Sequence, residues 1–229
     1  MTGPLKPLAD RRSRLLAHNA GTWVGQFVRL DANGIEQNRF DSHLLVTDLD
    51  GLIEASLTNR DSGEVRRMAF GEPPADMQIS REGHWSLGPD RVGPWPWVSE
   101  LCLVHGEQRR RAVVRLGSDQ LESLVIVWEG RPQQADPAPA APLRAMARAA
   151  APVGLAAAGE QGQTIWTIAA GLEIVIPDRR HPGSAQALAL RWQPQPGLQL
   201  EIQRAYDPYG NLLGPGVAGG ADWPGSTAP

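Results

Sequence analysis

The sequence predicts an all-β protein: an antiparallel up-and-down β-barrel with a short N-terminal helix and a second, smaller β-rich part. Short runs of strand length alternate with Gly, Asn, Asp and Pro turn signals. No helical crossover separates these runs, which favours antiparallel over parallel pairing. A Gly-Thr-Trp sequence opens the first strand. A small barrel of this kind usually encloses one small ligand.

The N-terminal segment predicts a helix followed at once by a strand. Residues 7–20 place their leucines near one helical face, with arginines between them. Gly21 then allows the chain to turn from helix to strand without a Cβ clash. We expect Trp23 to plug the closed end of the barrel.

Nine strands in total form the predicted barrel. A turn at residues 31–34 joins the first two strands, and similar turns follow. The stretch from 71 to 97 is rich in Pro and Gly, so its strands are expected to be short. The predicted strands are 23–30, 35–47, 52–59, 64–70, 77–79, 84–87, 98–105, 109–116 and 121–129.

Composition divides the chain into four parts. Residues 1–131 form the predicted barrel, and 132–160 form a linker rich in Pro and Ala. Residues 161–213 contain four strand signals, too few for a closed barrel, so they form a second half or cover an edge of the first sheet. Residues 214–229 are expected to be a disordered tail.

The overall composition is that of a globular protein, with 41% hydrophobic and 21% charged residues. No apolar run reaches the ~20 residues of a membrane span, and no signal peptide is visible, so we expect a cytoplasmic chain. A net charge of −3 argues against a nucleic-acid partner. Cys102 is the single cysteine, which excludes an internal disulfide, and its place in a strand pattern predicts a buried apolar role.

Known catalytic patterns are missing from the sequence. Lys6 is the only lysine, so Schiff-base chemistry is excluded from the body of the chain. The five histidines are scattered without metal-ligand spacing, and we expect no metal. The chain has no P-loop, dinucleotide-binding glycine pattern or GxSxG elbow. We therefore assign no catalytic residue.

An arginine ladder is the first candidate for ligand binding. Arg109, Arg111 and Arg115 lie on one face of one strand, whose successive positions (109, 111, 113 and 115) are ~7 Å apart. Glu100 lies on the preceding strand. Guanidinium groups inside a barrel would bind a ligand's carboxylates. The alternative is a solvated face with cross-strand Glu partners, and the sequence does not decide between them.

Tryptophans are the second candidate. The chain has eight Trp against three Phe and two Tyr. Trp85, Trp95 and Trp97 fall close together, the last two in a Trp-Pro-Trp segment that suits a stiff loop better than a core strand. We interpret Trp85 and Trp97 as indoles that could stack on a flat ligand at the rim; core filling is the alternative.

These features together resemble a known family. The segment NAGTWVGQFVRLDANG, Glu100, the strand QRRRAVVRL and the later segment ALRWQPQPGLQLEIQRAYDPYG are similar to an uncharacterised lipocalin-like (calycin) family of cyanobacteria and plastids, DUF3598. That family resembles the lipocalin-type phycobiliprotein chromophore lyases, which hold a linear tetrapyrrole (bilin). The resemblance implies that Glu100, Arg109 and Arg111 are polar groups of a pocket and that Trp23 is the barrel plug.

The sequence therefore predicts a binding protein for a small hydrophobic ligand that carries a carboxylate, such as a bilin or a fatty-acid-like molecule. The ligand-binding set is Glu100, Arg109, Arg111, Arg115, Trp85 and Trp97. One alternative is a lyase-like activity with a phycobiliprotein subunit as partner. The other is a protein-interaction or assembly module without a ligand, in which the Trp-Pro-Trp segment is a docking surface.

Overall fold

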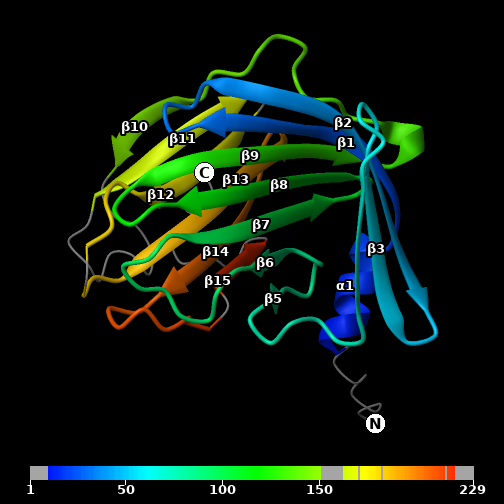
Figure 1. Cartoon of the computed structure of the whole chain (residues 1–229), viewed down its shortest axis with the longest axis horizontal. Helices are drawn as coiled ribbons and strands as arrows, with labels where there is room; N and C mark the ends of the chain where they lie inside the picture. Colours follow the sequence, from blue (N-terminus) through cyan, green and yellow to red (C-terminus); the bar gives the residue numbers. More distant parts are fainter. Residues whose placement is uncertain (1–9, 151–161, 170, 182, 215, 220–229) are drawn as a thin grey trace.

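The computed structural model describes residues 10–150, 162–169, 171–181, 183–214 and 216–219. Within these residues the protein is all-β apart from one α-helix and one short 3-10 helix, which confirms the predicted fold class. The strands form two antiparallel sheets, a large one and a small one (Figure 1).

The large sheet follows the helix in the sequence. Helix α1 spans Arg11–Asn19 and begins at Asp10, whose side chain accepts a hydrogen bond from the Ser13 amide at 2.6 Å. The strands of the large sheet are β1 (Gly21–Asp31), β2 (Glu36–Leu49), β3 (Leu52–Asn59), β4 (Val65–Phe70), β5 (Gln78–Ile79), β6 (Trp85–Leu87), β7 (Trp97–His105), β8 (Gln108–Leu116) and β9 (Leu121–Gly130).

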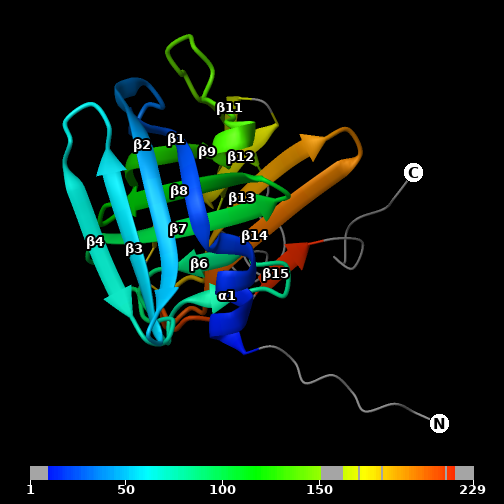
Figure 2. The same ribbon diagram turned by 90° about the vertical axis from the view of Figure 1, so that its right-hand side faces the viewer.

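The large sheet curls into half a barrel and remains open. Its order is β4-β3-β2-β1-β9-β8-β7-β6-β5, so only a β4–β5 pairing would be needed to close it. β5 has two residues and β6 three, too few to pair along β4, and Pro73 and Pro74 precede β5. Figure 2 shows β2, β3 and β4 turned across the direction of β7 and β8.

Helix α1 lies beside this open seam. Arg11 donates to the Pro74 carbonyl at 2.6 Å and to that of Met77, and Arg12 donates to the Gly71 carbonyl at 3.0 Å. Leu15 packs into the apolar cluster on the same side of the sheet. Helix α1 therefore holds the loop between β4 and β5 by hydrogen bonds, at the seam where these two edge strands do not pair with each other.

The small sheet comes from the second part of the chain. Its strands, in spatial and chain order, are β10 (Met146–Ala150), β11 (Gln163–Ala169), β12 (Leu172–Pro177), β13 (Gln186–Gln195), β14 (Leu198–Tyr206) and β15 (Gly216–Gly219). The described part thus corrects two expectations. Helix η1 (Pro132–Gln134) and β10 lie in the stretch predicted as a linker, and β15 lies in the predicted tail, because each strand completes the backbone pairing of a neighbour. Residues 151–160, 215 and 220–229 of those two segments lie outside the described residues. The four-part division of the chain into domains stays a prediction.

The main core lies between the two sheets. β8 presents Ala112, Val114 and Leu116 to it, and the small sheet contributes residues such as Ile174 and Trp192. Arg109 and Arg111 lie on the opposite face of β8. This face points to the concave side of the curled large sheet, which we call the hollow. Strand alternation thus gives the large sheet two buried faces, one apolar and one that carries both apolar and charged side chains.

His84 gives this fold a testable pH dependence. The residue is buried beside the loop that contacts α1, and its Nδ1 accepts a hydrogen bond from the Val104 amide at 3.2 Å. Burial lowers the pKa of His84 to about 4, despite the attraction of Glu82. A lowered folded-state pKa means that stability is present above pH 6.5 and is lost as the pH falls toward 4.

We therefore expect the free energy of unfolding to fall by about 2 kcal/mol between pH 7 and pH 5. In a His84→Gln variant, whose side-chain oxygen can still accept the Val104 bond, this loss should disappear. Urea unfolding at the two pH values measures it. An equal loss in both proteins would assign the pH dependence to other groups.

Candidate ligand-binding site

The hollow of the large sheet contains a cavity of about 410 Å³. Its volume is within the range of small-molecule sites. The floor is apolar, and Phe27 and Phe40 stack there at 4.9 Å between ring centroids. The polar groups come from the ends of the strands. The lining residues are Phe27, Arg29, Asn38, Phe40, Leu57, Asn59, Glu64, Arg66, Val113 and Val125.

A buried cluster of charges adjoins this cavity. Glu129 accepts hydrogen bonds from Arg109 Nε at 2.7 Å and from Arg111 Nε and Nη2, both at 2.9 Å. Arg111 Nη1 also donates to Glu100 at 2.6 Å. The cluster contains two guanidiniums and two carboxylates, so its formal charges cancel. The guanidinium of Arg111 lies 5.2 Å from the Phe27 ring, which connects the cluster to the cavity floor.

The charge state of the cluster follows from its geometry. Burial opposes ionisation of Glu129, but Arg109 and Arg111 outweigh it and lower its pKa to about 2. For Arg111, burial favours the neutral form, and the nearby Glu129 and Glu100 reverse this, so its pKa rises. Glu129 and Arg111 are therefore both charged at neutral pH, and neither is placed to act as a general acid or base there.

Trp23 lies below the cluster and is fully buried. Its ring is placed between two guanidiniums, with Arg109 at 4.3 Å and Arg131 at 3.9 Å from the ring centroid. Its indole N–H donates to the Asn19 carbonyl at 3.0 Å. Gly21 has φ +93°, a conformation that favours glycine where α1 joins β1.

The structure brings together only part of the predicted binding set. Glu100, Arg109 and Arg111 meet in the charge cluster, whereas Arg115 is exposed on the same strand beyond the cavity. Trp85 is buried on the hollow side near α1, and Trp97 is buried in the core between the sheets. The two indoles thus lie on opposite faces of the sheet, because Trp97 pairs with Leu116, whose side chain faces the core. The ligand-binding role of these residues stays a prediction.

Sequence reasoning missed two members of the site. Asn19 links elements far apart: its Oδ1 accepts from Trp85 Nε1 at 3.1 Å and from Arg109 Nη1 at 3.2 Å. Glu129 neutralises both buried arginines. The signal for Glu129 was its position at the end of a strand next to the arginine strand. Asn19 gave no signal, because its partners come from distant segments.

The described residues offer no reactive thiol, no metal site and no membrane-spanning helix. Cys102 is buried behind the cluster, and burial raises the pKa of its thiol to about 12, which leaves it protonated. Within the described ranges, no group of three His, Cys, Asp or Glu side chains could hold a metal ion. The helices of those ranges include none long and apolar enough to cross a membrane.

Comparisons with known proteins identify a structural neighbour. No family model matches the chain, and no curated protein matches it. Among solved structures, a protein of unknown function from the DUF3598 family of Nostoc punctiforme is similar, with a TM-score of 0.74 and 16% identity. The match covers 89% of this chain and 96% of that chain, so it includes both sheets. The chain therefore shares the fold of this DUF3598 protein over nearly its whole length.

Proposed function

We propose that the protein binds a small amphipathic ligand with a carboxylate group in the hollow of the large sheet. The observation that carries the proposal is the cavity of about 410 Å³, with an apolar floor and polar groups at its edge. Such a site buries the apolar body of a ligand and orients its polar end. The fold comparison is compatible with this proposal and does not test it.

The charge cluster supports a particular orientation of the ligand. Arg109 and Arg111 already bond to Glu129 and Glu100, so a ligand carboxylate gains little by approaching them. Arg29 and Arg66 line the cavity from its edge, and Arg66 has only an exposed partner, Glu64, at 2.9 Å. We infer that the carboxylate binds at this edge and that the apolar body reaches toward Phe27.

A blocking variant tests the proposal. Leu57 lines the cavity, and Leu57→Trp should fill it and weaken binding of a dansyl-labelled fatty acid by about tenfold or more. Energy transfer from the protein's tryptophans to the dansyl group measures binding. The matched control is Leu45→Trp on the outward side of β2, where the side chain is 39% exposed. The control should bind like the unmodified protein. Equal affinity for all three proteins would reject the hollow as the site.

The same titration separates the ligand classes. A linear tetrapyrrole is followed by its absorbance and a fatty acid by displacement of the dansyl probe. A lyase-like reaction, with a phycobiliprotein subunit as acceptor, requires a bound tetrapyrrole first. If neither ligand binds, the interaction-module alternative gains support. The cytoplasmic location is likewise proposed, since it depends on the sequence alone.

A further inference from the structure

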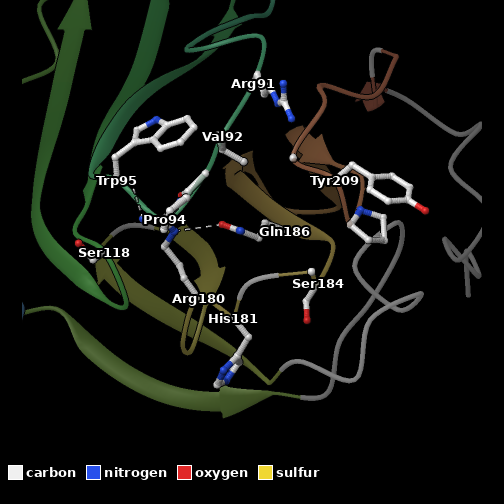
Figure 3. A pocket seen from close by; sticks show the side chains of 14 residues that line it. Arg91, Val92, Pro94, Trp95, Ser118, Arg180, His181, Ser184, Gln186 and Tyr209 are labelled. Carbon is white, nitrogen blue, oxygen red and sulfur yellow. Dashed lines mark hydrogen bonds between the residues drawn. The ribbon is translucent and has the colours of Figure 1, made fainter.

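A second pocket lies away from the hollow, where loops of the two sheets meet (Figure 3). We call it the end pocket. It has a volume of about 270 Å³. It is formed by residues 91–95 before β7, Ser118 after β8, residues 180–181 and 183–184 between β12 and β13, Gln186 at the start of β13, and residues 208–210 after β14. Its volume is just below the range of drug-sized sites, which suits a ligand with a single ring.

Arg180 forms the base of the end pocket and is almost fully buried. Its guanidinium donates to the carbonyls of Gly93, Gly117 and Trp95, the last at 3.0 Å, and to Gln186 Oε1 at 3.2 Å. All four acceptors are neutral. The carbonyls of these loops thus solvate the positive charge of Arg180 but do not neutralise it.

The other buried arginines of the described chain show two kinds of partner. Arg109, Arg110 and Arg111 each bond to a carboxylate. Arg204, like Arg180, bonds only to neutral acceptors, but Arg180 borders a pocket that a ligand can enter. Arg180 has no bond to a carboxylate in the described residues; burial lowers its pKa, and Asp119 opposes this from outside the pocket lining. A buried charge without a counter-ion is costly, and an anion in the adjoining pocket would offset that cost.

The other residues that line the end pocket add positive charge and no negative charge. Arg91 contributes a second guanidinium, and no described lining residue is acidic. This pocket therefore offers a positive potential in a protein whose net charge is −3.

Two exposed aromatic side chains flank the end pocket. Trp95 is 52% exposed and Tyr209 is 80% exposed, and Figure 3 shows them on opposite sides of Arg180. The Trp95 ring packs on Gly93, where an added Cβ would come within 2.3 Å of the ring. The indole is thus held at the pocket by a contact that only glycine permits at this position. Exposed aromatic faces of this kind stack on flat apolar groups.

We propose that the end pocket binds a small aromatic anion, with one ring against Trp95 and one carboxylate or phosphate group toward Arg91 and Arg180. This is a site separate from the hollow and takes a smaller ligand. The anion provides the counter-charge that Arg180 lacks, and the ring accounts for the exposed indole.

Binding is tested on the full chain with phenyl phosphate, benzoate, inorganic phosphate and benzyl alcohol as probes. The readout is the indole N–H resonance of Trp95 in a nitrogen–proton correlation spectrum, assigned with Trp95→Phe. We expect phenyl phosphate or benzoate to shift this resonance saturably. Benzyl alcohol and inorganic phosphate should bind at least about tenfold more weakly. The relative affinities of the first two probes identify the anionic group.

Arg91 and Arg81 are both exposed, so their substitution keeps the fold intact during this test. Arg91→Gln should weaken binding of the aromatic anion about tenfold, and the matched control Arg81→Gln, outside the end pocket, should not change it. Gly93→Ala should displace the indole and weaken binding as well. The proposal is overturned if benzyl alcohol shifts Trp95 as strongly as phenyl phosphate, or inorganic phosphate binds as tightly. It is also overturned if Arg91→Gln and Arg81→Gln have equal effects.

Discussion

Replacing Glu129 with glutamine is expected to lower the free energy of unfolding by about 3–5 kcal/mol. The substitution keeps the size of the side chain and removes the charge that Arg109 and Arg111 share. Both guanidiniums are buried, Arg109 to 2% exposure, so solvent does not replace the lost partner. The remaining Glu100 reaches only Arg111. Urea unfolding at pH 7 measures the loss.

The matched control is Glu64→Gln. It breaks an Arg–Glu pair of similar length, 2.9 Å between Arg66 Nε and Glu64, on an exposed strand. Such pairs contribute about 0–1 kcal/mol. If the two variants lose equal stability, the buried cluster has no special role in holding the hollow together.

The pH dependence of the same variant provides an internal check. The pKa of Glu129 lies at about 2, below its ordinary 4.5, so its stabilisation is present above pH 4.5 and is lost as the pH falls toward 2. Glu129→Gln should remove this acid-dependent loss. A variant that retains the full acid transition would assign that transition to other carboxylates.

Substitution of Arg204 by methionine should cost about 3–5 kcal/mol through loss of contact between the two sheets. Arg204 is fully buried on β14. Its Nη2 donates to the Gly88 and Pro89 carbonyls at 2.6 and 2.8 Å, and its Nη1 donates to the Asp76 carbonyl at 2.8 Å. All three acceptors belong to loops of the large sheet. Methionine fills similar space and removes this donor from the Gly88 and Asp76 carbonyls, whereas the Pro89 carbonyl keeps its bond from the Tyr206 hydroxyl at 2.9 Å.

Arg191→Met provides the comparison within the small sheet. Arg191 bonds to Glu201 of the neighbouring strand at 2.7 Å and, within the described residues, its side chain forms no hydrogen bond to the large sheet, so the expected cost is about 1 kcal/mol. The edge contact of Trp97 and Tyr206, 5.3 Å between centroids, gives a second readout by near-ultraviolet circular dichroism. Unchanged stability and an unchanged spectrum in Arg204→Met would show that apolar packing alone joins the sheets.

Local patterns predicted much of the fold. The alternation in QRRRAVVRL correctly separated Arg109 and Arg111 from Ala112 and Val114, because side chains of a strand must point to opposite faces. Turn residues located the hairpin between β1 and β2, where Gly34 has φ +74°. The pattern left open which face was buried. In the structure both are, since the small sheet covers one and the curled sheet encloses the other.

The sequence did not predict the features that depend on contacts between distant segments. The open seam arises because β5 and β6 are too short to pair with β4, and helix α1 occupies that side instead. The role of Arg180 depends on three loops that meet only in the folded chain. Trp97 was interpreted as a rim residue because of its flanking proline, whereas its register places it in the core.

The pairing of β1 with β9 also determines when this protein can fold. Val24 is aligned with Gly130 and Asp31 with Ser123, so β1 can pair on this side only with a strand synthesised about a hundred residues later. Contacts this distant in sequence slow folding. During translation the first four strands have their apolar sides uncovered, a condition in which aggregation competes with folding. Assistance from a chaperone at that stage would protect the nascent chain until β9 arrives.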